Sequence, residues 1–354
     1  MVKIDDKHIN FRYIDGYNAD FNFIISGRES GKTTQTWLKL YNAFKNRNEC
    51  SLVIRRRTCH ITTAYIDDIA KIINKFTDDN VTFKYTASSM KDGIVDVKIN
   101  NKLFFRVIGL SGDITKFKSL MITNLRYIVF DEFIPNLKYK EKYLTDEVNK
   151  FKDIYNTFQR ESNKLTCYFL GNPYSLFCPY FLEYGFNTNE IKLGCCLYNK
   201  NKSAVLWYYK LSDELIAYIK SKNSLFKEED LYTGFSLFGE NINDKNIKIV
   251  DNMPQGFQLN TVFYIENKYI CFYKTTTYKD DFYYYVKFLE KNEVLSRKRD
   301  IYTFDLDDLQ LNNVLLTNET RLILKNLRRS FEFGLIAFQN IECYYLSKEI
   351  YKSI

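Results

Sequence analysis

The sequence has few of the residues that build metal centres. Only two histidines, His8 and His60, occur in its 354 residues, and its eight cysteines form no C-x-x-C pair. Because a zinc site needs clustered soft ligands, this pattern gives no indication of a zinc protein. Irregularly spaced cysteines in a chain without an export signal are typical of reduced thiols in a cytoplasm.

Long apolar runs are also missing from the sequence. None approaches the ~20 residues that a membrane helix requires, and the first ten residues, MVKIDDKHIN, contain no apolar signal-peptide core. We therefore expect a soluble, intracellular protein with no membrane partner. Internal repeats and low-complexity tracts are likewise absent from the sequence, which leaves ordinary globular domains.

The composition is globular, with 45% hydrophobic and 27% charged residues. The formal net charge is +8, and most of this excess lies in residues 1–199, which hold 29 Lys and Arg against 22 Asp and Glu. A positive N-terminal domain suits a polyanionic partner such as nucleic acid. The 29 Tyr and 29 Phe accompany abundant Lys, Asn and Ile, which indicates an A/T-rich coding sequence rather than base-stacking platforms.

Strand and helix patterns alternate through the first half of the chain. Strands are expected at residues 21–26, 51–57, 81–86, 94–100, 102–110, 126–132 and 165–173, and helices at 32–47, 61–76 and 141–160. Several of these strands are apolar throughout, which is typical of a parallel sheet covered by helices on both faces. The sequence therefore predicts an α/β domain with a mostly parallel sheet over residues 1–199.

The rest of the chain divides into two further regions. Residues 200–245 have mixed charge and one or two helical patterns, and we expect a small helical linker subdomain there. From residue 246 strand patterns come first and helical patterns follow. They cover residues 258–267, 268–278, 280–290, 319–335 and 338–352. This order predicts an α+β C-terminal domain over residues 246–354.

The strongest motif is the octapeptide SGRESGKT at residues 26–33, between the first expected strand and the first expected helix. In such a Walker A loop the backbone wraps around phosphate oxygens, and exposed N–H groups and the helix dipole bind the anion. Lys32 is expected on the β- and γ-phosphates and Thr33 on Mg²⁺. Ser26 occupies the first glycine position of the motif. The predicted ATP-binding residues are Gly27, Arg28, Glu29, Ser30, Gly31, Lys32, Thr33 and Thr34.

A second motif, YIVFDE, covers residues 127–132. Its four apolar residues indicate a core strand, and the acids follow at the carboxyl end, where ligands bind in a parallel sheet. Asp131 is expected in the Mg²⁺ shell, and Glu132 is expected to orient and deprotonate the attacking water. A carboxylate directly after the magnesium aspartate favours ATP hydrolysis over transfer of the phosphoryl group to a metabolite.

Two further polar residues fit the same kind of site. Asn172 follows an apolar strand and is a candidate γ-phosphate sensor, with an ordinary Asn-Pro turn as the alternative. Arg160 ends a long helical pattern and is the candidate arginine finger, delivered from a neighbouring subunit. The alternative for Arg160 is a residue that complements the helix dipole. Arg28, inside the Walker A loop, is an alternative source of positive charge that acts in cis.

Two basic clusters are candidate DNA contacts. Arg56 and Arg57 end the second expected strand, and Lys116 and Lys118 lie in a polar loop shortly before the acidic motif. Such side chains grip DNA phosphates without reading the base sequence. The alternative for each of them is an ordinary solvated charge.

Together these motifs resemble the terminase-like genome-packaging ATPases of tailed phages, above all the short encapsidation ATPases of small podophages. Arg28 stands four residues before the Walker A lysine, as an arginine does in that family. The segments YIVFDEFIPN (127–136) and TFQRESNKLTCYFLGNPYSLFCPYF (157–181) resemble the Walker B, finger and sensor segments of the family. The segment IYTFDLDDLQLNNVLLTNE (301–319) resembles part of its C-terminal domain.

The resemblance implies an additional-strand P-loop NTPase that uses ATP and Mg²⁺, a linker subdomain and a C-terminal domain of RNase H-like descent. It implies a homo-oligomeric ring, a pentamer, that drives double-stranded DNA into a prohead. The ring would dock transiently on the portal in the host cytoplasm and would be absent from the mature virion. Because some relatives use a structured packaging RNA, an RNA partner is a further expectation.

The acids of the C-terminal region argue against an active nuclease. Asp305, Asp307 and Asp308 cluster, but no Asp-x-Gly opens the first strand of the domain, where Glu266 is the nearest acid. Since a terminase nuclease gathers several carboxylates around two metals, we expect a nuclease-dead domain used for docking and DNA contact. A terminase with an active nuclease, and a P-loop helicase or other DNA translocase outside phage assembly, are the alternatives.

Overall fold

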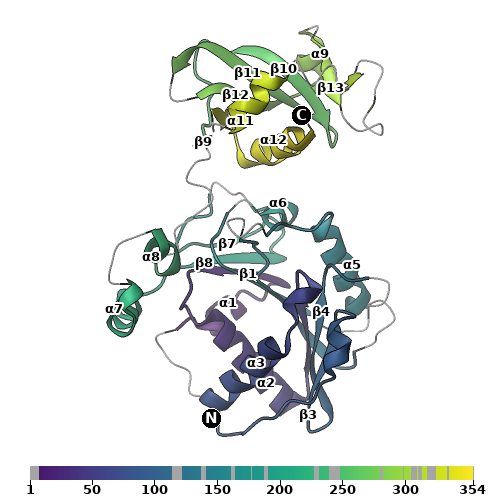
Figure 1. Cartoon of the computed structure of the whole chain (residues 1–354), viewed down its shortest axis with the longest axis vertical. Helices are drawn as coiled ribbons and strands as arrows, with labels where there is room; N and C mark the ends of the chain where they lie inside the picture. Colours follow the sequence, from purple (N-terminus) through teal and green to yellow (C-terminus); the bar gives the residue numbers. More distant parts are fainter. Residues whose placement is uncertain are drawn as a thin grey trace. The chain divides into compact units, whose positions relative to one another are not determined.

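The chain folds into two compact units, Met1–Asn243 and Asp244–Ile354, each with a sheet of its own (Figure 1). The structure is a computed structural model. It describes residues 8–113, 122–136, 141–160, 164–176, 178–186, 190–226, 231–238, 248–279, 282–297, 299–303, 309, 313–316, 324–332 and 335–353. Among these residues, no helix combines the length and the apolar character needed to cross a bilayer.

The first unit contains an eight-stranded sheet in the order β3-β4-β2-β5-β6-β1-β8-β7. Its strands are β1 (Phe21–Ser26), β2 (Cys50–Arg55), β3 (Ile94–Ile99), β4 (Lys102–Gly109), β5 (Leu125–Asp131), β6 (Thr166–Gly171), β7 (Cys196–Tyr198) and β8 (Ala204–Tyr209). The six central strands are parallel, and β3 and β7 are antiparallel edge strands. The mostly parallel sheet predicted from the sequence is confirmed.

One strand separates the two that precede the predicted phosphate and magnesium residues. β6 pairs with β1 on one side and with β5 on the other, in both cases in parallel. The carboxyl ends of all three strands therefore meet at one edge of the sheet. This order is the additional-strand arrangement expected for the domain.

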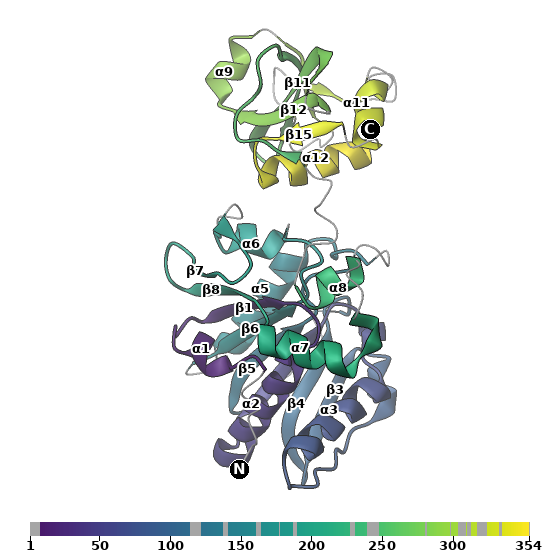
Figure 2. The ribbon, with the colours of Figure 1, turned by 90° about the vertical axis from the view of Figure 1, so that its left-hand side faces the viewer.

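Helices cover both faces of this sheet (Figures 1 and 2). On one face lie α1 (Phe11–Asp15), α2 (Lys32–Arg47) and α3 (Thr63–Phe76), and on the other α5 (Glu147–Gln159) and α6 (Pro179–Glu183). Successive side chains of a strand point to opposite faces. Leu52 and Ile54 of β2 accordingly pack in the core beside α5, whereas Val53 packs in the core beside α2. Two apolar cores explain why these strands are apolar throughout.

The first sheet continues beyond residue 199, where the sequence analysis placed a domain boundary. β8 pairs with β1 over six residues, and the side chains from Ala204 to Tyr208 are buried. The expected boundary falls between β7 and β8 and is corrected by this pairing, because two strands of one sheet belong to one domain. The helices expected in this region are α7 (Asp213–Lys222) and α8 (Leu231–Ser236). Side chains of α7 form a small apolar cluster with Leu211, Phe226 and Leu237, the residue directly after α8.

Two other segments differ from expectation. The expected strand at 81–86 makes one isolated bridge, from Lys84 to Lys98, and does not form a ladder. The helix expected from residue 141 begins at Glu147. A tight hairpin turn connects β3 and β4, where Asn100 and Asn101 have φ of 49° and 63°, the conformation that asparagine tolerates in a two-residue hairpin.

The second unit is built on a seven-stranded mixed sheet in the order β14-β13-β10-β11-β12-β15-β9. Its strands are β9 (Lys248–Ile249), β10 (Gln258–Ile265), β11 (Lys268–Lys279), β12 (Phe282–Leu289), β13 (Ile301–Thr303), β14 (Asn313–Leu315) and β15 (Ile336–Phe338). β10, β11 and β12 form an antiparallel meander, and the other pairs are parallel.

The helices of the second unit are α9 (Lys291–Leu295), α11 (Lys325–Glu332) and α12 (Ile341–Ser353). Side chains of α11 and α12 pack on one face of the sheet, and Val294 of α9 packs on the other. The mixed sheet with helices agrees with the expected α+β domain. Its RNase H-like descent stays a prediction.

Candidate functional site

The predicted phosphate-binding loop connects β1 to α2. β1 ends at Ser26 and α2 begins at Lys32. The turn passes through two left-handed residues, Glu29 with φ 60° and Gly31 with φ 77°. A Cβ on Gly31 would lie 2.8 Å from the His8 ring, so both the conformation and the space require glycine there. Gly31 is also the N-cap of the 16-residue α2 and offers no capping side chain, which suits an anion at this helix end.

Lys32 lies inside this loop. Its side chain is buried, and its amine donates to the carbonyl oxygens of Ser26 and Gly27 at 3.3 Å each and to Oδ1 of Asn172 at 2.7 Å. Burial lowers the pKa of the Lys32 amine to about 8, although the carboxylates of Asp131 and Glu132 act in the opposite direction. The structure therefore brings together Lys32, Asn172 and the two acids that were predicted separately.

Asp131 ends β5, and Glu132 follows in a left-handed conformation with φ 57°. Arg55, at the end of the neighbouring β2, holds both acids. Its Nη1 donates to Asp131 Oδ2 at 2.6 Å, and its Nη2 donates to Glu132 Oε2 at 2.7 Å. The Asp131 side chain is 12% exposed, whereas that of Glu132 is 56% exposed. Burial raises the pKa of the Asp131 carboxyl, and the positive charge of Arg55 opposes this shift.

Tyr65 of α3 completes this part of the site. Its ring centroid lies 4.8 Å from the guanidinium carbon of Arg55, and its hydroxyl lies 3.5 Å from Asp131 Oδ2. Burial raises the pKa of the Tyr65 hydroxyl well above its ordinary value, so Tyr65 remains a neutral donor. Arg55 is thus fixed by a ring on one side and two carboxylates on the other.

Arg28 contacts the segment that follows Asn172. Its Nη2 donates to the hydroxyl of Tyr174 at 3.0 Å. Thr33 is exposed and Thr34 is half-buried in the first turn of α2, next to the loop. These positions agree with the predicted phosphate and magnesium contacts of the loop, which stay predictions.

Arg160, the predicted arginine finger, is an exposed residue at the C-cap of α5. α5 begins at Glu147, close to the acids, and 13 residues of α-helix extend about 20 Å. Arg160 therefore lies at the far end of this helix from Asp131 and Glu132 of its own chain.

The four residues predicted to contact DNA have different environments or lie outside the described residues. Arg56 is 3% exposed, and its guanidinium is bonded to Glu147 and to the carbonyl oxygens of Glu132 and Phe133. The expectation that Arg56 grips DNA is therefore wrong for this structure, because the side chain is directed into the core by a buried carboxylate. Arg57 is half-buried, and its predicted role is untested. Lys116 and Lys118 lie outside the described residues.

The acids considered for a nuclease are only partly covered. Glu266 lies in the tight turn between β10 and β11, where its φ is 49°. Asp305, Asp307 and Asp308 lie outside the described residues. In the part of the chain that is described, no group of three or more His, Cys, Asp or Glu side chains is arranged to hold a metal ion.

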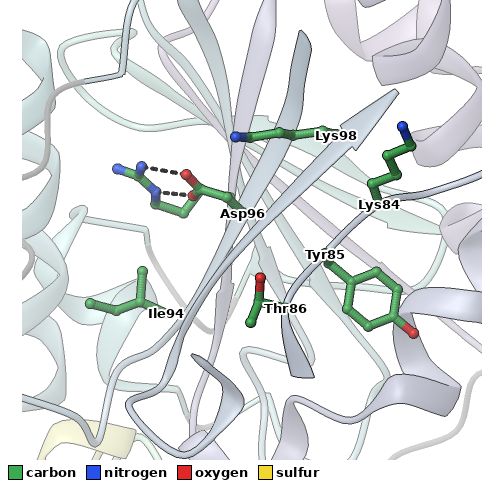
Figure 3. Close-up of a pocket in the computed structure, with 7 residues that line it drawn as sticks. Lys84, Tyr85, Thr86, Ile94, Asp96 and Lys98 are labelled. Atoms are coloured by element: carbon green, nitrogen blue, oxygen red, sulfur yellow. Dashed lines mark hydrogen bonds and ion pairs between the residues drawn. The ribbon is translucent and has the colours of Figure 1, made fainter. Parts of the chain in front are cut away.

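A separate polar pocket of about 480 Å³ lies at the β3–β4 edge of the first sheet (Figure 3). Arg106 of β4 forms two hydrogen bonds with Asp96 of β3 there, and Lys84 and Lys98 line the same pocket. None of the residues lining this pocket belongs to the predicted nucleotide site.

Sequence reasoning missed the roles of Arg55, Tyr65 and Tyr174. Arg55 directly precedes Arg56 and Arg57 in the basic run for which the sequence predicts DNA contact. Its position at the carboxyl end of a strand was the available signal, but the pairing of β2 with β5 was needed to place it on the acids.

A parallel sheet with an additional strand, a glycine loop around a buried lysine, and two acids at the same sheet edge define a P-loop NTPase fold. Residues 6–354 match the family model described as Podovirus DNA encapsidation protein (Gp16). The chain therefore belongs to this family.

Individual relatives extend over nearly the whole chain. The DNA packaging protein of Bacillus phage phi29 is 25% identical over 344 residues, which are 96% of this chain and 95% of that protein. The DNA packaging protein of Bacillus phage B103 is 22% identical over 347 residues, covering 96% and 98%.

Two solved structures share the fold. One is the bacteriophage Phi-29 viral genome packaging motor assembly, with a TM-score of 0.69, 20% identity and coverage of 98% of this chain and 99% of that chain. The other is the Phi-28 gp11 DNA packaging motor, with a TM-score of 0.63, 15% identity and coverage of 98% of each.

Proposed function

We propose that this protein is an ATP-hydrolysing translocase that packages double-stranded phage DNA into a preformed prohead. The observation that carries the proposal is the convergence of Lys32, Asn172, Asp131 and Glu132 at the carboxyl ends of β1, β6 and β5. Membership of the encapsidation protein family indicates that the energy of ATP hydrolysis is used for genome packaging.

The residues present fit a nucleoside triphosphate with magnesium. Gly31 places no capping side chain at the start of α2, and the Lys32 amine is held by three oxygens that phosphate oxygens would replace. Thr33 and Asp131 are the oxygen donors for Mg²⁺, which, when bound, supplies charge neutralisation at the phosphates. Because Asp131 is bonded to Arg55 here, metal binding requires this ion pair to loosen.

Glu132 is the proposed general base. Its carboxylate is more than half exposed, so water reaches it, and it follows directly on the magnesium aspartate. Because Arg55 holds Oε2 of Glu132 at 2.7 Å, a proton from water is taken by the other carboxylate oxygen, Oε1, or by Oε2 after it leaves Arg55. Asn172, already bonded to Lys32, then lies where the presence of a γ-phosphate changes its hydrogen bonding.

Arg160 is the proposed arginine finger, and the protein acts as a ring, with a pentamer as our expectation. In its own chain Arg160 lies at the far end of α5 from the acids. Its guanidinium would therefore act in the nucleotide site of a neighbouring subunit. Arg28, bonded to Tyr174 beside Asn172, supplies positive charge in cis. Portal, DNA and packaging RNA are the proposed partners, and the C-terminal unit is proposed to dock and to contact DNA without cutting it.

The decisive experiment measures ATP hydrolysis with DNA and proheads, together with packaging. Lys32→Ala should abolish nucleotide binding and packaging, and Glu132→Gln should abolish hydrolysis while nucleotide still binds. Lys45→Ala, which removes a half-exposed lysine of α2 paired with Asp79, is the matched control and should package normally. Hydrolysis that persists in both variants would overturn the proposal, and measurable strand separation would make the protein a helicase.

The ring is tested by mixing subunits. Arg160→Ala and Glu132→Gln subunits should each be inactive alone, and a mixture should recover part of the hydrolysis if the finger acts in trans. Recovery that never exceeds the sum of the separate variants would remove the support for a trans finger. Manganese-dependent cleavage of plasmid that is lost in Asp305→Ala or Asp307→Ala would show an active nuclease.

A further inference from the structure

Arg56, which directly follows β2, and Glu147, the first residue of α5, form a buried ion pair. Their side chains are 3% and 1% exposed, and Nε of Arg56 donates to Glu147 Oε2 at 2.9 Å. Removing charges from water is costly unless every polar atom finds a partner. A pair buried this deeply therefore calls for an account of what it holds in place.

The remaining donors of Arg56 hold the acidic turn, which we define as residues 131–133. Nη1 donates to the carbonyl oxygen of Glu132 at 3.0 Å, and Nη2 donates to the carbonyl oxygen of Phe133. The guanidinium carbon also lies 5.7 Å from the ring centroid of Phe130 and 5.2 Å from that of Tyr143. One planar side chain thus joins the backbone of the acidic turn to Glu147.

The acidic turn needs such support. Glu132 has φ 57°, a left-handed conformation that costs an ordinary residue about 1–3 kcal/mol and persists only where its surroundings enforce it. The two carbonyl oxygens that Arg56 binds belong to Glu132 itself and to Phe133, so the guanidinium holds the peptides on both sides of Phe133, directly after this residue. Arg56 therefore determines where the Glu132 carboxylate points, although it touches none of the reacting atoms.

Glu147 is the residue through which α5 contacts Arg56. Besides Arg56, its carboxylate accepts from the backbone N–H of Leu144 at 2.8 Å and from the hydroxyl of Tyr180 at 3.2 Å. Its position as the first residue of α5 also suits a negative charge on the helix dipole. The residue before it, Asp146, is a left-handed N-cap that caps no backbone N–H, and its side chain instead accepts from Nδ2 of Asn149 at 2.6 Å. Glu147 therefore anchors the start of the helix to Arg56 and Tyr180.

α5 extends this connection to Arg160. Phe151, Ile154 and Phe158 are buried along one side of the helix, which makes it a packed rod rather than a loose segment. Arg160 follows directly as the C-cap. A displacement of the acidic turn is therefore passed through Arg56 and Glu147 to the arginine at the far end of α5.

We infer that Arg56 is a positioning residue that sets the Glu132 carboxylate, and that the Arg56–Glu147 pair couples the state of the nucleotide site to Arg160. This inference rests on the proposed function and assigns to Arg56 a role inside the motor in place of DNA contact. In this inference the acidic turn, the Arg56–Glu147 pair and α5 move together as a rigid unit.

The test compares Arg56→Lys and Glu147→Gln with Arg106→Lys in the full chain. Arg106 is a matched control, because it is also a largely buried arginine paired with a carboxylate of the first sheet, Asp96, in the lining of the polar pocket at the β3–β4 edge (Figure 3). Lysine keeps the charge of Arg56 but loses the planar fork that reaches two carbonyl oxygens and a carboxylate. We expect kcat to fall at least tenfold in Arg56→Lys, nucleotide affinity to stay within threefold, and both quantities to be unchanged in Arg106→Lys.

Hydrogen exchange gives a readout that a purely structural role would not change. In the wild-type chain, nucleotide should alter amide exchange both in the acidic turn and in α5, and in Glu147→Gln the change in α5 should disappear while that in the turn remains. If wild-type α5 does not respond to nucleotide, or if folded Arg56→Lys turns over normally, the inference is wrong. If wild type binds and hydrolyses no ATP, the proposed function itself has failed.

Discussion

The amine of Lys32 lies 2.7 Å from Oδ1 of Asn172, so the phosphate-binding loop after β1 is bonded directly to the tip of β6. The two residues are separated by 140 positions in the chain and are brought together because β1 and β6 are parallel neighbours. A ligand that draws the lysine amine away frees the amide of Asn172. The contact thus gives β6 a way to respond to occupancy of the loop.

Asn172→Ala tests this response. The variant removes the acceptor but leaves Lys32 available to phosphates, so nucleotide affinity should stay within about threefold. Hydrogen bonds to charged groups contribute about 1.5–3 kcal/mol, and a loss of this size in the transition state lowers kcat by at least tenfold. Calorimetry gives the affinity and steady-state hydrolysis gives kcat. Asn201→Ala, in the exposed turn before β8, is the control, and a variant that loses binding but not turnover would contradict a sensor role.

Arg55→Gln should destabilise the protein even without nucleotide. Arg55 and Asp131 are 11% and 12% exposed, and removal of one partner leaves the other charge buried and unpaired, which costs about 3–5 kcal/mol. Urea unfolding measures the loss. The double variant Arg55→Gln with Asp131→Asn should lose less than the sum of the single variants, because the lone charge is gone.

Arg47→Gln is the matched control for Arg55→Gln. Arg47 is 55% exposed and pairs with Glu49 at the surface, where ion pairs contribute less than about 1 kcal/mol. Equal losses in the two arginine variants would show that burial of the Arg55 pair has no special weight.

Much of the site could be predicted because its signals are local. The loop SGRESGKT, the acids after YIVF and the asparagine after TCYFL each follow a recognisable apolar strand, and parallel strands bring such ends together. The contacts of Arg55 and Arg56 could not be predicted in this way. Both depend on β2 lying beside β5 and, for Arg56, on a buried glutamate 91 positions away.

The errors in the fold have the same origin. AVLWYY (204–209) falls within the predicted helical linker, because nothing near it in the sequence shows that it pairs with β1, about 180 positions earlier. Conversely, VTFKYT (81–86) has the residues of a strand but finds only one bridge, at Lys84. The β-propensity of a segment is a weak guide to its structure, because strand formation depends on whether a partner strand lies beside it.

Nucleotide binding should weaken above about pH 8. Burial places the pKa of the Lys32 amine at about 8, below its ordinary value, so the free protein loses this proton as the pH rises through that value. Phosphate binding favours the protonated amine, and above pH 8 a proton must be taken up for each nucleotide bound. The affinity should then fall by up to tenfold per pH unit.

Calorimetry in buffers with different ionisation enthalpies counts these protons directly. Uptake near zero at pH 7 and approaching one at pH 9 is the expected result. Lys32→Arg keeps its charge over the whole range, so any residual binding by this variant should show no such uptake. Identical uptake in the two proteins would assign the proton to another group.

Gly171→Ala should disturb the contact between β6 and the acidic turn. A Cβ on Gly171 would lie 2.6 Å from Cε1 of Phe133 and 3.1 Å from Cδ1 of Ile134, and the backbone N–H of Phe133 donates to the carbonyl oxygen of Leu170. Overpacking of this kind costs about 1–3 kcal/mol. Since Phe133 also accepts from Arg56, the clash displaces the turn, and kcat should fall along with the free energy of unfolding.

The double variant Gly171→Ala with Phe133→Leu separates the clash from a general loss of packing. Leucine withdraws the ring edge that the new methyl group would meet, so the double variant should be more stable than the sum of the two single losses predicts. Urea unfolding of the four proteins gives this coupling energy. Strict additivity would mean that Phe133 does not meet the methyl group and that the crowding lies elsewhere in the strand.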